Sequence, residues 1–164
     1  FNFVMQEMNT HEQFMKRAIE LSVQKMKLNE GGPFGAVIVK DNKIIGEGWN
    51  KVTSQKDPTA HAEVSAIRHA CQQTGHFKLE GAILYTSCEP CPMCLAAVYW
   101  AKIKKIYYAS DREIAAKYKF DDSYIYQEIN LKIQDRKIPM TQLLKAESEI
   151  SFKEWELKQD KIRY

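Results

Sequence analysis

The stretch AILYTSCEPCPMCLAAVYWAKIKKIYYA, residues 82–109, decides the fold of this chain. Residues 82–87 form an apolar run rich in strand-forming side chains, which predicts a short β-strand. Residues 92–102 predict a helix that follows a proline-containing turn, and residues 103–109 predict a further strand. Because a helical crossover connects strands that run in the same direction, we expect these two strands to be parallel.

The residues before this stretch predict two helices and a hairpin. The tetrapeptide Thr-His-Glu-Gln at residues 10–13 fits a capping box, so a helix is expected to begin there. Residues 34–40 and 43–49 are apolar and β-branched runs separated by an Asp-Asn turn, which predicts a β-hairpin. Residues 61–73 have the character of a second helix.

The pattern after the last predicted strand is weaker. We expect short helices near residues 112–119 and 123–130, an extended segment near residues 138–145 that Pro139 interrupts, and a closing helix over residues 148–161 with Ser148 as its cap. Together the elements predict a three-layer α/β/α fold, in which helices flank a central mixed sheet of about five strands.

The chain is expected to form a single domain over residues 1–164, because no linker, repeat or low-complexity segment divides it. Residues 1–9 are expected to be disordered or foreign to the natural protein, because the chain begins with Phe1 rather than Met. Apolar residues make up 45% and charged residues 27%, a balance that excludes disorder, collagen and coiled coil.

The charge and the hydropathy of the chain indicate where the protein works and what it binds. Its apolar runs are too short for a membrane span and no signal peptide is visible, so a cytoplasmic protein with no membrane partner is expected. The net charge of +3 is mild for a nucleic-acid binder, so such a partner is not expected. The basic cluster of Lys102, Lys104 and Lys105 is interpreted as a solvated corner between a helix and a strand.

The cysteines point to metal or redox chemistry rather than to disulfides. Cys88, Cys91 and Cys94 fall within seven positions, which is a poor layout for bridges between distant parts of a fold. The fourth cysteine, Cys71, is expected to be a small core residue on the helix after His61.

Two short motifs each open a predicted helix and together predict a zinc site. His61, Cys91 and Cys94 offer one nitrogen and two thiolates, which leaves a tetrahedral zinc one position short, as a catalytic zinc requires. That position takes water, whose pKa the metal lowers. The backbone N–H groups of Ala62 and Cys91, at the helix starts, are expected to polarise the bound water or the reaction intermediate.

Glu63 lies two residues from His61, close to the metal without having to bind it. A carboxylate there can accept the proton of the water and return it to a substrate nitrogen and then to the leaving amine. The pair His-x-Glu and Pro-Cys-x-x-Cys is a known signature of zinc deaminases.

Each motif alone has a simpler explanation. An isolated His-x-Glu is common as a surface pair, and an isolated Cys-x-x-Cys indicates structural zinc or thiol redox chemistry equally well. A structural zinc would need a fourth ligand, for which Cys88 is the available candidate. We expect Cys88 to lie at the end of its strand with its sulfur directed elsewhere.

The match extends beyond the ligands. GPFGA at residues 32–36, DPTAHAE at residues 57–63 and TSCEPCPMC at residues 86–94 resemble the purine-acting branch of the cytidine deaminase superfamily. That branch contains the bacterial guanine deaminases and the tRNA adenosine deaminases, which share these motifs. YWA at residues 99–101, FDDSYIY at residues 120–126 and a C-terminal helix followed by a terminal tyrosine resemble the guanine deaminases.

The resemblance implies roles in substrate binding for several residues. Asn50 would hydrogen-bond the purine, Phe34 would pack against its ring, and Trp100 would help to close the pocket. Asp122 would accept a hydrogen bond from a ring N–H or from the exocyclic amine. Without the resemblance, Trp100 would be interpreted as a core residue of an apolar helix face.

Tyr164 resembles the family residue that seals the site. In that family the C-terminal segment is exchanged between two subunits, which implies a homodimer in which Tyr164 acts on the pocket of its partner. From its position alone, Tyr164 would be interpreted as a frayed chain end without a function.

The resemblance implies a hydrolase of purine metabolism that uses one zinc ion per chain to convert guanine to xanthine and ammonia. The alternatives are deamination of guanosine, cytosine, a pterin or an aminotriazine, or of adenosine in tRNA. A non-enzymatic alternative is an interaction module held together by a structural zinc.

Overall fold

The structure is a computed structural model that describes residues 2–164, with side chains from Thr10 onward. The chain divides into two compact units, Phe1–Ser123 and Tyr124–Tyr164, which are described separately. Phe1 lies outside the described residues.

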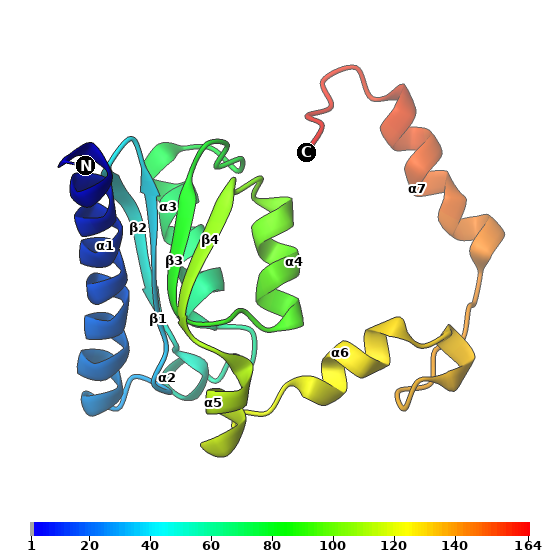
Figure 1. Ribbon diagram of the computed structural model, residues 1–164. Helices are drawn as coiled ribbons and strands as arrows, with labels where there is room; N and C mark the ends of the chain where they lie inside the picture. Colours follow the sequence, from blue (N-terminus) through cyan, green and yellow to red (C-terminus); the bar gives the residue numbers. More distant parts are fainter. Residues whose placement is uncertain (1) are drawn as a thin grey trace. The chain divides into compact units, whose positions relative to one another are not determined.

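The first unit is built on a mixed four-stranded sheet in the order β2-β1-β3-β4 (Figure 1). Its strands are β1 (Gly35–Lys40), β2 (Lys43–Trp49), β3 (Ile83–Cys88) and β4 (Lys105–Ser110). β1 is antiparallel to both β2 and β3, whereas β3 and β4 are parallel, as the helical crossover predicted.

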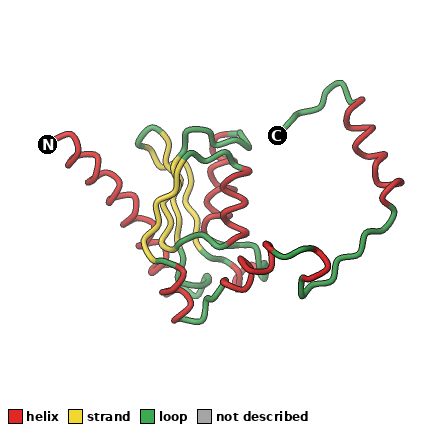
Figure 2. Tube along the Cα trace, turned by 45° about the vertical axis from the view of Figure 1, so that its right-hand side comes forward, coloured by secondary structure: helices red, strands yellow, loops and turns green. Residues whose placement is uncertain are grey.

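Helices cover both faces of this sheet, which confirms the three-layer arrangement (Figures 1 and 2). α1 (Asn2–Lys27) packs on one face against β1 and β3. α3 (Ala62–Thr74) packs against β2 and β1 on the other face, where α4 (Pro92–Trp100) contacts it. The short helices α2 (Val52–Gln55) and α5 (Arg112–Lys117) complete the unit, α2 within a stretch that has no helical pattern in the sequence.

Alternate residues of the central strand β1 supply two separate cores. Val37 and Val39 pack toward α1 with Leu21 and Tyr85. Ala36 and Ile38 face the other way, into the cluster that α3 and α4 cover. This alternation follows from the two-residue period of a strand and explains why β1 is apolar along most of its length.

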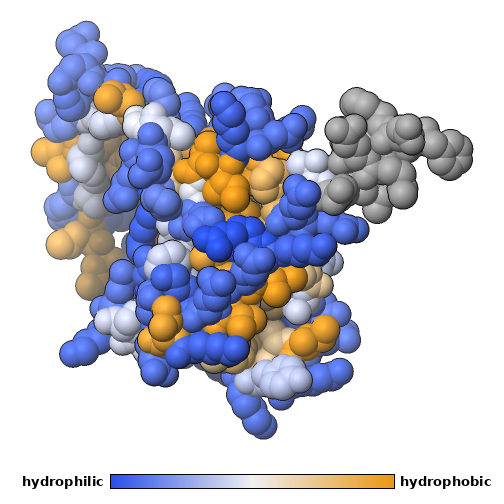
Figure 3. Space-filling model, turned by 90° about the vertical axis from the view of Figure 1, so that its left-hand side faces the viewer, coloured by the Kyte–Doolittle hydropathy of each residue, from blue (hydrophilic) through white to orange (hydrophobic). Residues whose placement is uncertain are grey.

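α1 buries one face and leaves the other to solvent. Ala18, Leu21 and Ser22 are buried against the sheet. The side of the molecule that carries α1 is mainly hydrophilic, with hydrophobic residues in small patches (Figure 3). The predicted helix start at Thr10 is wrong, because α1 already begins at Asn2. The intervening Met-Gln-Glu-Met favours helix, which explains the extension.

α3 approaches β2 at backbone contact distance. A methyl group on Gly48 would lie 2.2 Å from the Ala66 nitrogen and 2.3 Å from the Ala62 oxygen. A methyl group on Gly46 would lie 2.6 Å from the Ala66 oxygen. Glycine on the strand and alanine on the helix therefore set the separation of these two elements.

The second unit contains α6 (Ser123–Asn130), a 3-10 helix η1 (Ile133–Asp135) and α7 (Lys145–Leu157). The helices predicted near residues 112–119 and 123–130 are therefore confirmed. The extended segment predicted near residues 138–145 contains no strand in the described structure, so the sheet has four strands where about five were expected. α7 begins at Lys145 rather than at Ser148, and its N-cap residue Leu144 has a left-handed conformation with φ of 52°.

Among the described residues, none in the range 124–164 is buried. No helix in the described part of the chain combines the length and the apolar character that crossing a membrane requires.

The contact between α3 and β2 predicts a strong effect of one methyl group. We expect Gly48→Ala to lower the free energy of unfolding by at least about 2 kcal/mol, because the methyl group meets helix backbone that cannot move aside. Gly75→Ala is the control, because a methyl group there has no heavy atom within 4 Å and costs only about 1 kcal/mol for its left-handed backbone. Urea denaturation measures both; equal losses would contradict the packing argument.

Candidate active site

The site forms where the N-termini of α3 and α4 meet beside the end of β3. His61 is the N-cap residue of α3, and Cys91 is the N-cap residue of α4, whose first residue is Pro92. The loop before α3 is held in place by a hydrogen bond of 2.8 Å from the Lys51 N–H to the Ala60 carbonyl. Two motifs 30 residues apart in the chain are therefore brought together by the fold.

The donor atoms of His61, Cys91 and Cys94 have the spacing of a tetrahedral zinc site. Nδ1 of His61 lies 3.6 Å from the Cys91 sulfur and 3.5 Å from the Cys94 sulfur. Tetrahedral zinc with ordinary zinc–nitrogen and zinc–sulfur bonds would separate such donors by about 3.6 Å. One imidazole and two sulfurs thus fit a zinc ion and leave its fourth position open.

The electrostatics of the three ligands favour a metal. A hydrogen bond from the Cys94 thiol and the nearby His61 lower the pKa of Cys91 to about 4. The neighbouring Cys91 and burial raise the pKa of Cys94, and the hydrogen bond to Cys91 raises the pKa of His61. Two sulfurs that share one proton in a buried site are stabilised when a cation replaces that proton.

Cys88 is directed away from this cluster, as expected. It is the last residue of β3, and its sulfur donates a hydrogen bond of 3.8 Å to the Asp111 carbonyl. Burial raises the pKa of Cys88 to about 11, so it remains a protonated thiol. Cys71 packs half-buried against the core, which confirms its predicted role.

Glu63 lies in the first turn of α3 with only 6% of its surface exposed. Burial raises the pKa of its carboxyl group, against the opposing effects of its own backbone N–H and of the Cys94 thiol. The Thr86 hydroxyl lies 3.3 Å from Glu63 Oε1 and 3.0 Å from the Cys88 carbonyl. Thr86 belongs to the TSCEPCPMC motif, but no role for it was predicted from the sequence.

Asn50 is buried at the end of β2, and its side-chain oxygen is fully engaged. Oδ1 accepts hydrogen bonds from the Gly32 N–H at 3.0 Å and from the Val52 N–H at 3.2 Å. Its backbone N–H donates to the Phe34 carbonyl at 3.0 Å. The two bonds fix the orientation of the amide and leave its NH2 group as the donor that can meet a ligand.

Two aromatic rings and a carboxylate lie near the motifs. Phe34 packs edge-on against Phe120, with ring centroids 4.9 Å apart. Asp122 is half-buried, and burial and the nearby Cys91 raise the pKa of its carboxyl group while Arg112 opposes them. Phe120, like Asp122, lies in the FDDSYIY motif, and its contact with Phe34 is a feature that sequence reasoning missed.

The structure does not bring Trp100 to the metal ligands of its own chain. Trp100 is the last residue of α4, whereas Cys91 precedes its first, so about 13 Å of helix separates them. Trp100 is 66% exposed, so its interpretation as a core residue is wrong. Tyr164 belongs to the second unit and is 78% exposed. Ala62 is the first residue of α3, where the amide N–H groups of a helix lack intrahelical partners.

Comparisons with known proteins agree with this site. Residues 8–110 match the family described as the cytidine and deoxycytidylate deaminase zinc-binding region. Guanine deaminase of Bacillus subtilis is 53% identical over 88% of this chain and 93% of that protein. The X-ray structure of guanine deaminase from Bacillus subtilis superimposes with a TM-score of 0.91 and 51% identity, covering 94% of this chain and 98% of that chain.

A tRNA-specific adenosine deaminase of Haemophilus influenzae is 41% identical, but over only 69% of this chain and 68% of that protein. The fold and the site together define a zinc-binding deaminase. The chain belongs to the cytidine and deoxycytidylate deaminase family, in its guanine deaminase branch.

The geometry predicts which cysteines retain zinc. We expect Cys91→Ala and Cys94→Ala to lose the metal, because each removes one of three donors. Cys88→Ala is the matched control and should keep one zinc ion per chain, because its sulfur contacts the Asp111 carbonyl instead. Atomic absorption on purified protein measures this; loss of zinc from Cys88→Ala would indicate a closed structural site.

Proposed function

We propose that this chain is a zinc-dependent aminohydrolase of purine catabolism or salvage that converts guanine and water to xanthine and ammonia. The observation that carries the proposal is the three-donor site with the buried carboxyl group of Glu63 beside it. The similarity to guanine deaminase over nearly the whole chain supports guanine as the substrate.

His61, Cys91 and Cys94 would hold the zinc ion, which supplies a Lewis acid that activates a water molecule. Glu63 accepts a proton from the water that adds at C2 of the purine. It delivers this proton to the adjacent ring nitrogen N3. Glu63 then takes the proton of the new C2 hydroxyl and passes it to the amino group, so that the C2 carbonyl forms and ammonia leaves. The backbone N–H groups of Ala62 and Cys91 stabilise negative charge that develops at the helix starts.

The Thr86 hydroxyl suits a carboxyl group that changes its protonation state. A hydroxyl has one hydrogen, so Thr86 can donate either to the Cys88 carbonyl or to Glu63. When Glu63 is protonated, Thr86 can accept a hydrogen bond from it while donating to Cys88. Thr86 can therefore keep a hydrogen bond to Glu63 in both protonation states of that carboxyl group.

The groups around the site fit an aminopurine. The NH2 group of Asn50 donates to an acceptor such as the purine carbonyl or a ring nitrogen. Phe34, which Phe120 supports, offers a ring face or edge for stacking. Asp122 supplies an acceptor for a ring N–H or for the exocyclic amine.

The alternatives have less support. A tRNA deaminase needs a basic surface, whereas the basic residues of α7 alternate with Glu147, Glu149, Glu154 and Glu156. A structural-zinc module needs a fourth ligand, and Cys88 is directed to a backbone carbonyl. Guanosine, cytosine, a pterin or an aminotriazine remain alternatives that differ from guanine by only a few pocket contacts.

The second unit supports a homodimer in which C-terminal segments are exchanged. Several of its large apolar side chains, among them Ile138, Leu143, Phe152 and Leu157, are more than two-thirds exposed. Such a surface is too apolar to remain in water, so a second copy of the chain would cover it. Tyr164 would then reach the pocket of the partner subunit.

A cytoplasmic location fits the thiols. All four cysteines are free, and a reducing compartment keeps Cys91 and Cys94 available for the metal.

A panel of aminated heterocycles assayed for ammonia tests the proposed function. We expect guanine to be the preferred substrate, ahead of guanosine, cytosine, a pterin and an aminotriazine, with no release from an anticodon stem-loop. The control is Glu63→Gln, which keeps the shape of the side chain and the zinc but loses at least about a hundredfold in kcat. A stem-loop that outperforms guanine, or a zinc-replete Gln variant with full activity, would refute the assignment.

Mixed dimers test whether Tyr164 acts on the partner subunit. Glu63→Gln and a variant that lacks Tyr164 are each expected to be nearly inactive alone. If Tyr164 acts across the dimer, a mixed dimer rebuilds one complete site, because Glu63 comes from one chain and Tyr164 from the other. After equal amounts of the two are mixed, unfolded and refolded, we expect up to about a quarter of the unaltered activity, because about half of the dimers are mixed and each has one complete site of two. No recovery in a confirmed mixed dimer would place Tyr164 in its own chain's site.

A further inference from the structure

Glu30 connects three elements through three separate contacts. One carboxylate oxygen, Oε2, accepts a hydrogen bond of 2.6 Å from the indole N–H of Trp49 at the end of β2. The other, Oε1, pairs with Lys25 of α1 at 3.2 Å. The backbone carbonyl of Glu30 accepts a hydrogen bond of 2.6 Å from the hydroxyl of Ser54 in α2.

The Trp49 ring is held as well as its N–H group. The ammonium group of Lys25 lies 4.0 Å from the ring centroid, and that of Lys51 lies 4.1 Å from it. Lys25 therefore serves both Glu30 and Trp49. The pairing with Lys25 lowers the pKa of the Glu30 carboxyl group, with the Trp49 hydrogen bond as a further cause, so Glu30 is ionised at neutral pH.

The residues that Glu30 joins lie next to Asn50. Trp49 precedes it directly, and the glycines that follow Glu30 touch it. A methyl group on Gly31 would lie 2.0 Å from the Asn50 carbonyl oxygen, and the N–H of Gly32 donates to Asn50 Oδ1 at 3.0 Å. The second donor to Oδ1 is Val52, in the same helix as Ser54.

We propose that Glu30 is a positioning residue for Asn50: it ties α1, β2 and α2 together and so fixes the backbone that orients the Asn50 amide toward the substrate. The inference rests on the proposed function, because that function assigns Asn50 to purine binding. Glu30 itself does not touch the substrate.

Loss of the Glu30 carboxylate frees the indole N–H of Trp49 and the ammonium group of Lys25. The Gly31–Gly32 backbone then loses the anchor that presents its N–H to Asn50. Because a hydrogen bond to a ligand weakens steeply when its donor moves, substrate binding suffers while the zinc ligands and Glu63 stay in place.

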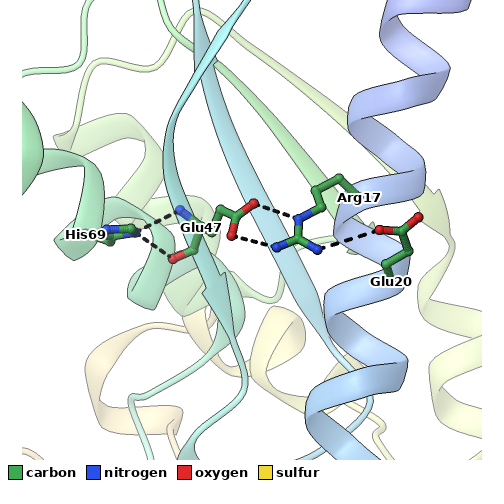
Figure 4. Close-up of polar contacts among 4 residues, drawn as sticks. All are labelled: Arg17, Glu20, Glu47 and His69. Atoms are coloured by element: carbon green, nitrogen blue, oxygen red, sulfur yellow. Dashed lines mark hydrogen bonds and ion pairs between the residues drawn. The ribbon is translucent and has the colours of Figure 1, made fainter.

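A second carboxylate provides a matched control on the same two elements. Glu47 of β2 pairs with Arg17 of α1, with oxygen–nitrogen distances of 2.7 and 3.0 Å, and Arg17 also pairs with Glu20 (Figure 4). The backbone of Glu47 contacts His69 of α3 (Figure 4). Glu47 thus joins α1 to β2 as Glu30 does, but its carboxylate pairs with Arg17 rather than with Trp49, Gly32 or Ser54.

The test measures KM and kcat for guanine, zinc content and the urea midpoint in each variant. We expect Glu30→Ala to raise KM about three- to tenfold, with kcat within about twofold and one zinc per chain. Glu30→Gln keeps an oxygen for the Trp49 N–H, so KM should stay within about twofold of the unaltered enzyme. Glu47→Ala should lower the urea midpoint and leave KM unchanged.

Two further variants keep the test decisive. Trp49→Phe retains a ring but removes the indole N–H, so its KM should rise as that of Glu30→Ala does. This variant tests the proposal even if Glu30→Ala fails to fold. Asn50→Ala should raise KM at least about tenfold, and the addition of Glu30→Ala to it should raise KM no further, because both changes act through one amide.

An unchanged KM in both Glu30→Ala and Trp49→Phe, or effects of Glu30→Ala and Asn50→Ala that multiply, overturn the positioning role alone. A KM that rises equally in Glu47→Ala also overturns it, because any loss of contact between α1 and β2 would then be enough to weaken substrate binding. No guanine turnover by the unaltered enzyme refutes the proposed function, and this inference with it.

Discussion

The backbone contact between α3 and β2 is the constraint on which the site depends. Gly46 and Gly48 have no side chain to hold the helix away, and the facing helix residues Ala62, Ala66 and Ala70 are small and fully buried. This contact fixes the height and the rotation of α3 over the sheet, and hence the place of its first turn. His61 and Glu63 reach Cys91, Cys94 and Thr86 because that turn lies at the end of β3. A methyl group on either glycine would push α3 away from β2 and separate the two halves of the metal site.

We expect the metal site to affect stability as well as chemistry. Without a cation, Cys91 and Cys94 share one proton in a place where burial disfavours charge, and Glu63 adds a third acidic group close by. A divalent cation compensates these charges, so binding energy contributes to folding. Cys88, a few residues away, behaves in the opposite way: burial keeps it a neutral thiol, whose sulfur donates to the Asp111 carbonyl.

The sequence predicted the parts of this arrangement that follow from local patterns. The β3-α4-β4 crossover, the hairpin of β1 and β2, and the cluster of His61, Cys91 and Cys94 follow from apolar runs, helix starts and ligand spacing. Features that depend on tertiary packing were missed, such as the contact of Phe120 with Phe34 and the hydrogen bond of Thr86 to Glu63. The start of α7 was also misplaced, because a left-handed Leu144 is not a residue that pattern rules place at a helix boundary.

The largest departure from sequence reasoning concerns Trp100 and the apolar side chains of the second unit, which are exposed in the single chain. Trp100 stands about one helix length from its own Cys91 and is mostly exposed, so a role in closing a pocket requires a pocket other than that of its own chain. Tyr99, next to Trp100, and the apolar side chains of the second unit are also exposed. The apolar area that they bury within the chain is too small to offset the entropy lost when the backbone that carries them is ordered. If the C-terminal segments are exchanged as proposed, the apolar surface that is exposed in one chain becomes the interface between two chains. Substrate specificity, which Trp100 and Tyr164 would share, then belongs to the dimer, whereas the proton transfer of Glu63 belongs to the single chain.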